Sequence, residues 1–354
     1  MSFFITILGL GIVIFIHELG HMLAAKWSGI GVYEFAIGMG PKIWSKKWRG
    51  TMYSLRMLPV GGFVKLAGVD DDEDEKAPPE LSFYHKPWSK RLLTIAAGSM
   101  MNLLLGFLIF VGIFTFIGVP RVSNEVQGTF PDSPAAEIGL TKGDKIMSLE
   151  GRAVTDMQKD FIAVVNKSVG IPLALTIERA GVAQTFTVTP KAKDKDLNIG
   201  LIGVELGTAL TRYNPVLSIG YGLQATWRNI TLVFKSLGML FSGRASFKEM
   251  AGPVGIVQFA SFSLGRGILQ FLQIMAMISI SLGVVNLFPF PVLDGGHLAF
   301  LLIEKVRGRA LNKKWERVIN NMGAAVLISL MVLIVLNDLV HWRDRVDLLH
   351  NLSK

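Results

Sequence analysis

The sequence His17-Glu18-Leu19-Gly20-His21 lies inside an apolar stretch that runs from Phe3 to Ala25. A stretch of this length can cross a bilayer as a helix. Ionisable residues at that depth are costly, so they indicate a functional site. On a helix His17 and His21 share one face and can hold one zinc ion, with Glu18 beside them as a general base on metal-bound water. The pattern predicts a hydrolytic metal site buried in a membrane.

The hydropathy of the whole chain is that of a membrane protein. Of its 354 residues 51% are hydrophobic, and the mean hydropathy is +0.45. Four apolar segments are long enough to cross a bilayer, about residues 2–25, 92–119, 268–293 and 318–340. We therefore expect a polytopic α-helical membrane protein with about four transmembrane helices. The first segment lacks a basic start and a small-residue cleavage site, so we interpret it as a retained span and not as a signal peptide.

A fifth segment, about residues 213–238, is only partly apolar because Arg228, Asn229 and Lys235 interrupt it. We expect an amphipathic helix on the membrane surface, with a spanning helix as the alternative. The chain thus divides into an N-terminal membrane part, an inserted domain, an amphipathic segment and a C-terminal membrane part. These parts are residues 1–119, 120–206, 207–267 and 268–354.

The net charge of +9 and the lack of cysteine narrow the function. Lys and Arg residues that flank membrane spans explain the charge. No basic stripe with interleaved aromatic residues indicates nucleic-acid binding, so the expected partners are membrane lipid and membrane proteins. Without cysteine there is no Cys nucleophile, disulfide or Cys-ligated zinc, so any zinc must be held by His, Asp or Glu.

Basic loops set the predicted orientation through the positive-inside rule. Residues 26–91 carry eleven Lys or Arg residues, and residues 298–317 carry six. Both loops are expected in the cytoplasm. This assignment places the inserted domain and both termini outside the cytoplasm.

Residues 52–68 contain two short alternating runs on either side of Pro59-Val60-Gly61-Gly62. This pattern predicts a β-hairpin. Its apolar character leaves two positions open, either at membrane depth, where it would line a cavity, or on the surface. The acidic residues 70–80 that follow include two prolines and are expected to form a solvated linker, with a regulatory contact as the alternative.

Residues 121–205 have the pattern of a small soluble α+β domain. Ser133-Pro134-Ala135 and Gly143-Asp144-Lys145-Ile146 predict a helix start and a strand, and residues 172–178 and 184–189 alternate as strands. Together with Gly139-Leu140 and Gly151, this pattern resembles a circularly permuted PDZ domain. The resemblance implies capture of a peptide C-terminus, with a domain that only screens access as the alternative. The implied peptide-binding loop contains Gly200, Leu201, Ile202 and Gly203.

A hydrolytic zinc site needs a third protein ligand besides His17 and His21. The best candidate is Asp294 at the end of the third apolar segment, where an unpaired carboxylate would be costly. The two glycines that follow it would permit a helix break, so that its side chain can reach the metal. His297 is a rival ligand that we interpret as a hydrogen-bonding neighbour. The remaining histidines are expected on the surface, namely His85, His341 and His350.

With these motifs the chain resembles the site-2 protease family of intramembrane zinc metalloproteases, peptidase family M50, and within it the bacterial regulator-of-sigma-E type with a single PDZ domain. The resemblance covers nearly the whole chain and rests on HELGH at 17–21, MLPVGG at 57–62, GPVG at 252–255 and NLFPFPVLDG at 286–295. It implies a bacterial inner-membrane protease. The implied roles are Zn²⁺ ligands for His17, His21 and Asp294, and catalytic base for Glu18.

The resemblance also implies a substrate class, the transmembrane segments of single-span proteins such as an anti-sigma factor or a remnant signal peptide. Well-known family members with two PDZ domains have substrate rules that do not transfer to this chain. A helical substrate must be unwound, because its amides are shielded in the helical ladder. The hairpin around Gly61 and Gly62 is expected to offer it an edge. At this substrate-binding position, Pro289 and Pro291 are expected to prevent a regular helix beyond Asn286. Asn286 is then expected to hold the substrate backbone by hydrogen bonds, with helix–helix contact as the alternative.

Two other classes of function fit parts of the pattern. A membrane-anchored PDZ scaffold with a non-catalytic metal site would need neither Glu18 nor Asp294. A metal-ion transporter would need more ionisable residues in the third and fourth spans, where only Asp338 occurs. The sequence therefore favours an intramembrane zinc endopeptidase.

Overall fold

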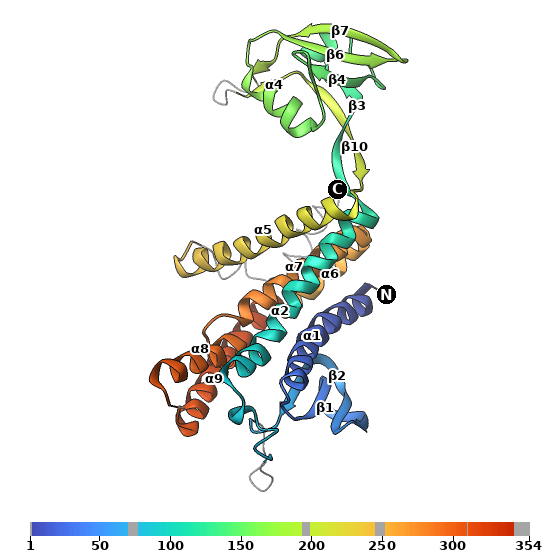
Figure 1. The fold of residues 1–354 in the computed structure, drawn as a ribbon. Helices are drawn as coiled ribbons and strands as arrows, with labels where there is room; N and C mark the ends of the chain where they lie inside the picture. Colours follow the sequence, from blue (N-terminus) through green and yellow to red (C-terminus); the bar gives the residue numbers. More distant parts are fainter. Residues whose placement is uncertain (1, 70–76, 193–198, 245–251, 310, 343–354) are drawn as a thin grey trace. The chain divides into compact units, whose positions relative to one another are not determined.

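The computed structural model describes residues 2–69, 77–192, 199–244, 252–309 and 311–342. Two compact units divide the chain (Figure 1). Unit 1 consists of Met1–Ile113 together with Asn214–Lys354, and unit 2 is the inserted Phe114–Tyr213.

Four helices of the described residues are long and apolar enough to cross a membrane. They are α1 (Ser2–Trp27), α2 (Trp88–Gly112), α7 (Ile268–Asn286) and α9 (Lys313–Val340), and α2 continues through a π-helical turn at Ile113–Ile117. Each of the four segments expected to span thus contains a helix long and apolar enough to do so. The third span is shorter than expected, because α7 ends at Asn286 and not at residue 293. Pro289 and Pro291 cannot continue a helix, so the chain turns there.

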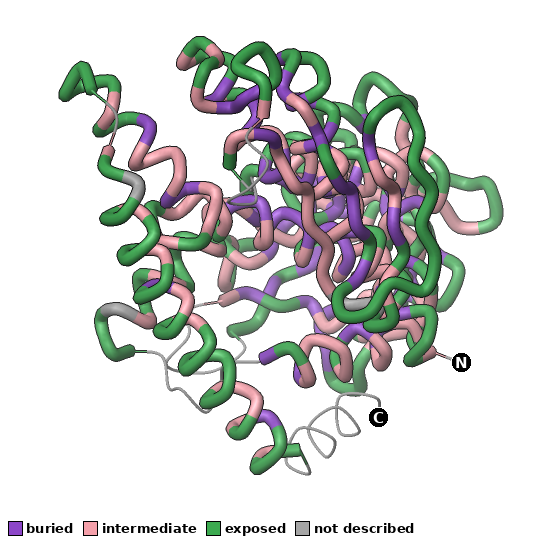
Figure 2. The backbone as a smooth tube through the Cα atoms, turned by 90° about the horizontal axis from the view of Figure 1, so that it is seen from below, coloured by how far each residue is buried: buried purple, intermediate pink, exposed green. Residues whose placement is uncertain are grey.

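Small residues let α1, α2 and α7 pack closely. A Cβ added at Gly20 of α1 would overlap the backbone of Ala97 in α2, and one added at Gly106 of α2 would overlap Ile280 of α7. Close backbone approach through glycine is typical of helices in membranes. Buried and exposed residues alternate along the helical backbone (Figure 2), as expected for helices with one packed side and one open side.

Three further helices cover this bundle. α5 (Pro215–Phe241) packs on α2 and α7, α6 (Pro253–Arg266) packs on α1 and α7, and α8 (Asp294–Arg307) packs on α2. α5 occupies the segment that was expected to be amphipathic, and it is not among the helices that are long and apolar enough to span. A short 3-10 turn, Phe83–His85, precedes α2.

Two long strands, β1 (Val32–Trp48) and β2 (Thr51–Leu66), form the sheet of unit 1. Residues 34–37 pair with residues 62–65 on one side and with residues 52–55 on the other, while residues 42–48 pair with 51–56. The expected hairpin around Pro59–Gly62 is therefore wrong in its pairing. Both of its runs are extended, but residues 34–37 of β1 lie between them. The alternation of apolar and polar residues predicts that a segment is a strand, but it does not predict which strand pairs with it.

Unit 2 is an α+β domain. Its main sheet has the order β10-β3-β4-β6-β7, with β5 beside β4. The strands are β3 (Val119–Thr129), β4 (Lys145–Leu149), β5 (Arg152–Ala153), β6 (Leu173–Arg179), β7 (Val182–Val188) and β10 (Val204–Thr211). A small second sheet pairs β8 (Lys191–Ala192) with β9 (Gly200–Leu201), and the helical segments are α3 (Pro134–Glu137), a π-helical turn (Met157–Ile162) and α4 (Ala163–Lys167).

The local signals of unit 2 produced the expected elements. Ser133 caps α3 by accepting a hydrogen bond from the Ala136 amide, and Ala180-Gly181 turns with positive φ between β6 and β7. Asp144 is buried and accepts two hydrogen bonds of 2.7 Å from Arg179, which anchor β6 to the loop before β4. The Arg179 guanidinium holds the pKa of Asp144 below its usual range.

Candidate metal centre

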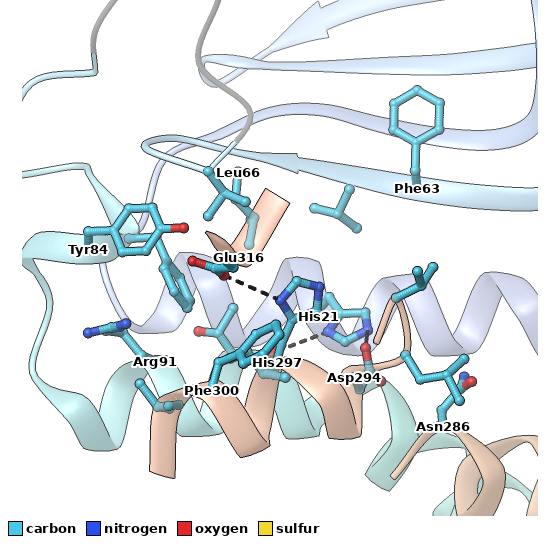
Figure 3. Close-up of a pocket in the computed structure, with 18 of the residues that line it drawn as sticks. His21, Phe63, Leu66, Tyr84, Arg91, Asn286, Asp294, His297, Phe300 and Glu316 are labelled. Carbon is cyan, nitrogen blue, oxygen red and sulfur yellow. Dashed lines mark hydrogen bonds and ion pairs between the residues drawn. The ribbon is translucent and has the colours of Figure 1, made fainter. Parts of the chain in front are cut away.

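Helices α1 and α8 bring three metal-binding side chains together, although 273 positions separate Asp294 from His21. His17 Nε2 lies 3.2 Å from His21 Nε2 and 3.5 Å from Asp294 Oδ2, and His21 Nε2 lies 3.4 Å from Asp294 Oδ1. Figure 3 shows His21 and Asp294 facing each other. The three expected ligands thus meet at one point.

These separations suit a tetrahedral zinc ion. Ligand atoms bound about 2.0–2.1 Å from such an ion lie roughly 3.3 Å from one another, and the observed separations cluster around that value. Two histidines and a carboxylate are a donor set typical of zinc enzymes. The side chains present therefore fit the cofactor in both chemistry and spacing.

The chain returns to the site through the loop between α7 and α8. Val292 in this loop has a positive φ of 78°, and α8 begins at Asp294. A Cβ added at Gly295 or Gly296 would overlap backbone atoms of the preceding loop. Neither Gly295 nor Gly296 has a positive φ. Their role is therefore to let the loop pack closely on the first turn of α8, and the break in the helix does not depend on their backbone freedom.

Helix α2 supports all three candidate ligands. The Thr94 carbonyl lies 2.9 Å from His21 Nδ1, the Ser99 hydroxyl donates to Asp294 Oδ2 over 2.9 Å, and the Asn102 amide lies 3.4 Å from His17 Nδ1. The bond to Thr94 places the proton of His21 on Nδ1 and leaves Nε2 as the metal-binding atom. Sequence reasoning missed these three residues.

Helix α2 also leaves room for the ring of His21. A Cβ added at Gly98 would overlap the ring of His21 at Nε2, so only glycine leaves room for the imidazole. A row of polar and small residues inside an apolar span was the available signal for this face of α2. Thr94 gives no such signal, because it acts through its backbone carbonyl.

A cavity of about 670 Å³ opens beside these ligands. Glu18 lines it, and so do Gly62, Phe63 and Val64 of β2. The strand passes close to the glutamate, because a Cβ added at Gly62 would lie 3.0 Å from Glu18 Cγ. The candidate base thus lies between the ligand cluster and residues 62–65 of β2.

The α8 helix is tied to α2 at the far end of this cavity. The buried Arg91 guanidinium donates two hydrogen bonds, of 2.7 and 2.8 Å, to the Glu304 carboxylate, and Trp88 Nε1 donates to the Leu301 carbonyl. Arg91 holds the pKa of the Glu304 carboxyl below its usual range. These contacts fix the helix that carries Asp294.

The other histidines that the structure describes lie apart from the ligand cluster. His297 lines the same cavity, but its Nδ1 lies 3.9 Å from Glu316 in α9 and it is not in the group of three ligands. His85 is exposed, and His341 ends α9 with its Nδ1 3.1 Å from the Asn337 carbonyl. His350 lies outside the described residues.

The predicted substrate-contact residues fall into two groups. Asn286 lines the cavity with its amide 3.4 Å from His17 Nε2, and Gly62 lines it from the sheet. Gly61, with a φ of 85°, instead contacts Met39, and Pro291 packs against Gly323 of α9. Pro289 lies in the same loop as Pro291, between α7 and α8.

The predicted peptide loop of unit 2 is engaged with its own domain. Gly200 and Leu201 form β9, the buried Ile202 accepts a hydrogen bond from the Ala135 amide, and Gly203 accepts one from the Phe130 amide. These bonds hold the loop at the start of β10, which is an edge strand of the sheet. Peptide binding here stays a prediction.

Comparison with known proteins now defines the family. A family model described as peptidase family M50 matches residues 5–330. The chain belongs to this family. It is an intramembrane zinc metalloprotease of the site-2 protease type, and it crosses a bacterial inner membrane several times.

Its relatives are similar along almost their entire lengths. The zinc metalloprotease RasP of Bacillus licheniformis is 31% identical, over 94% of this chain and 97% of RasP. The protease Eep of Enterococcus faecalis is 32% identical, over 93% and 96%. A Clostridium acetobutylicum protein whose name assigns it as a zinc metalloprotease is 35% identical, over 96% and 99%. The crystal structure of the PDZ domain of a Listeria monocytogenes SdrC-like protein covers 25% of this chain and 90% of that domain, at 28% identity and a TM-score of 0.22.

Proposed function

We propose that His17, His21 and Asp294 hold the catalytic zinc of this M50 protease and that Glu18 is its general base. One observation carries the assignment. Two histidines of α1, a helix that can span a membrane, meet the Asp294 carboxylate at the start of α8 at zinc-compatible separations, with Glu18 beside them. Bound zinc supplies Lewis-acid polarisation of the scissile carbonyl and a more acidic water. Glu18 takes a proton from the attacking water and delivers it to the leaving amine.

Asn102 has a positioning role in this assignment. Its side chain is fully buried, and its Oδ1 has no hydrogen-bond partner among the described residues. A half-turn of the amide places Oδ1, an acceptor, next to His17 Nδ1, and amide orientation is assigned from such networks. Asn102 Oδ1 then accepts a hydrogen bond from the Nδ1–H of His17. The Thr94 carbonyl accepts the corresponding bond from the Nδ1–H of His21. Both rings are thereby held with Nε2 toward the metal.

The substrate in this proposal is the transmembrane segment of a single-span membrane protein. Once unwound, it adds as a strand along residues 62–66 of β2, whose partner on the inner side is residues 32–37 of β1. Three observations support this position: Gly62, Phe63 and Val64 line the cavity, a Cβ at Gly62 would meet Glu18, and Asn286 lines the same cavity. The amide then holds the substrate backbone by hydrogen bonds.

The orientation proposed here follows the positive loops. Residues 26–91 and 298–317 lie in the cytoplasm, so cleavage occurs near the cytoplasmic side, and unit 2 and both termini lie outside. Unit 2 is a PDZ domain that excludes substrates with bulky external domains, and a peptide C-terminus at the loop of Gly200–Gly203 is its further ligand. The substrates are membrane-bound anti-sigma factors or remnant signal peptides.

Cleavage of a model transmembrane substrate by the purified full-length protein tests these roles, with zinc measured in the same samples by mass spectrometry. Wild type should hold about one zinc per chain. Glu18→Gln should keep the metal and lose cleavage by about 10²-fold or more, whereas Asp294→Ala should lose both. Near wild-type cleavage by Glu18→Gln, or full zinc in Asp294→Ala, would refute the respective role.

A further inference from the structure

The sheet of unit 1 has two edges. One is residues 62–65, beside the cavity, and the other lies at the opposite end of the strand order. Residues 42–49, here called the outer edge, pair with 51–56 on one side and end at the turn of Arg49 and Gly50. Every residue of the outer edge is exposed. Its sequence is Lys-Ile-Trp-Ser-Lys-Lys-Trp-Arg, which places bulky apolar groups and cations together on a surface.

Three of the four cations on this edge have no acidic partner among the described residues. Lys42 lies 3.4 Å from Glu34, but within the described part of the chain no carboxylate is in ion-pair distance of Lys46, Lys47 or Arg49. Arg49 lies 4.8 Å from the ring of Trp48. Trp44 and Trp48 are more than half exposed. Two exposed tryptophans beside three cations without carboxylate partners in the described part of the chain are typical of a surface that binds another molecule.

The outer edge is joined to the end of a membrane span. Lys26, in the last turn of α1, donates a hydrogen bond of 2.8 Å to the Tyr53 hydroxyl, and the ring of Tyr53 lies 6.1 Å from that of Trp48. Trp27, the last residue of α1, is 81% exposed. Tryptophan, tyrosine and basic residues gather where a span meets the membrane–water boundary. The contacts of the outer edge are therefore those expected of residues at that boundary.

We propose that the outer edge is a binding site for the headgroups of anionic phospholipids. Lys46, Lys47 and Arg49 meet the headgroup phosphates, while Trp44 and Trp48 enter the interfacial layer. An acidic protein would satisfy the cations but leave the tryptophans and their attachment to α1 without a role. Each cation near an anionic membrane surface strengthens binding about fivefold.

Lipid binding at this edge acts on the catalytic cavity through the sheet. Ser54 and Arg56 donate hydrogen bonds of 2.6 and 2.8 Å to Glu34, which tie residues 51–56 to residues 32–37. Residues 34–37 in turn pair with residues 62–65 beside the cavity. An anchored outer edge thus holds the strand that receives substrate. This consequence for substrate rests on the proposed function, but lipid binding itself does not.

Full-length protein in nanodiscs of phosphatidylcholine, with or without phosphatidylglycerol, provides the test. The variant is Lys46→Gln, Lys47→Gln and Arg49→Gln combined. The matched control is Lys142→Gln, Lys145→Gln and Arg152→Gln, three exposed cations of unit 2. Phosphatidylglycerol that remains bound after detergent extraction is counted by native mass spectrometry, and each chain is also prepared with Glu18→Gln, so that the result does not depend on protease activity.

We expect wild type and control to retain phosphatidylglycerol over phosphatidylcholine, and the outer-edge variant, which lacks three cations, to bind it on the order of 100-fold more weakly. Inorganic phosphate should not displace the lipid. Phosphatidylglycerol should also lower the KM of wild type for a transmembrane substrate, and not that of the variant. Equal retention by variant and wild type, or preferential binding of a poly-glutamate peptide, would overturn the proposal. Lipid retention with an unchanged KM would overturn the coupling to substrate.

Discussion

Replacement of Asn102 by leucine should weaken zinc binding about tenfold, a loss of roughly 1.4 kcal/mol. Removal of a group that supports a metal-bound histidine costs about 10–100-fold in metal affinity. The Asn102 contact to His17 is long, at 3.4 Å against 2.9 Å for the Thr94 contact to His21, so we expect the lower end of this range. Leucine has the same number and branching of side-chain heavy atoms as asparagine but no polar atom, so it removes the acceptor and keeps the shape of the side chain. No water can replace the lost acceptor, because Asn102 is fully buried.

A zinc-chelator titration of the purified protein, read by mass spectrometry, measures this loss directly. Asn102→Asp keeps an acceptor for the His17 Nδ1 proton and should bind zinc at least as tightly as wild type. Asn229→Leu is the matched control, because Asn229 is a buried amide of α5 that bonds the Ala225 carbonyl within its own helix. If Asn102→Leu held zinc within about twofold of wild type, the proposed acceptor role would be wrong, since even a weak supporting bond is expected to exceed that change.

Three further predictions follow from other contacts. Gly98→Ala should lose zinc because its methyl group would overlap the ring of His21, whereas Gly112→Ala in the same helix, where a Cβ meets open space, should keep it; zinc content decides. Asp144 has a lowered pKa, so its bond to Arg179 should stabilise unit 2 above about pH 4 and be lost as pH falls through that lowered pKa; amide exchange near β4 and β6 should show this loss in wild type and not in Asp144→Asn. Deletion of residues 121–206 should admit substrates that keep their external domain; a continued need for a first cut would reject the barrier role.

The ligand cluster could be predicted from the sequence because polar groups at membrane depth carry unusual information. His17, Glu18 and His21 interrupt an apolar run at helical spacing, and Asp294 closes another run. Burial of an uncompensated charge there is so costly that few explanations remain. The residue types and the hydropathy pattern together limited the choice of candidate ligands, and no knowledge of how the helices pack was needed.

The support from α2 could not be predicted in the same way. Ser and Thr are common in membrane helices and pass as ordinary contacts between helices, so Ser99 carried little information. Thr94 contributes a carbonyl, which every residue possesses. The pairing of β1 with both runs of β2 was hidden for a related reason, since strand pattern identifies a buried face but not which strand lies beside it.

The site is assembled from two structural parts with separate tasks. Helix α2 contacts all three candidate ligands, so it controls how well the metal is held. The sheet passes close to Glu18 at Gly62 and makes no hydrogen bond to a candidate ligand among the described residues, so in the proposed mechanism it controls how the peptide reaches the metal. Substitutions should therefore separate by location. Changes at Asn102 should alter zinc affinity more than KM, and changes at the outer edge should alter KM at constant zinc content. A sheet variant that lost zinc in proportion to its loss of substrate binding would show that the two parts act as one.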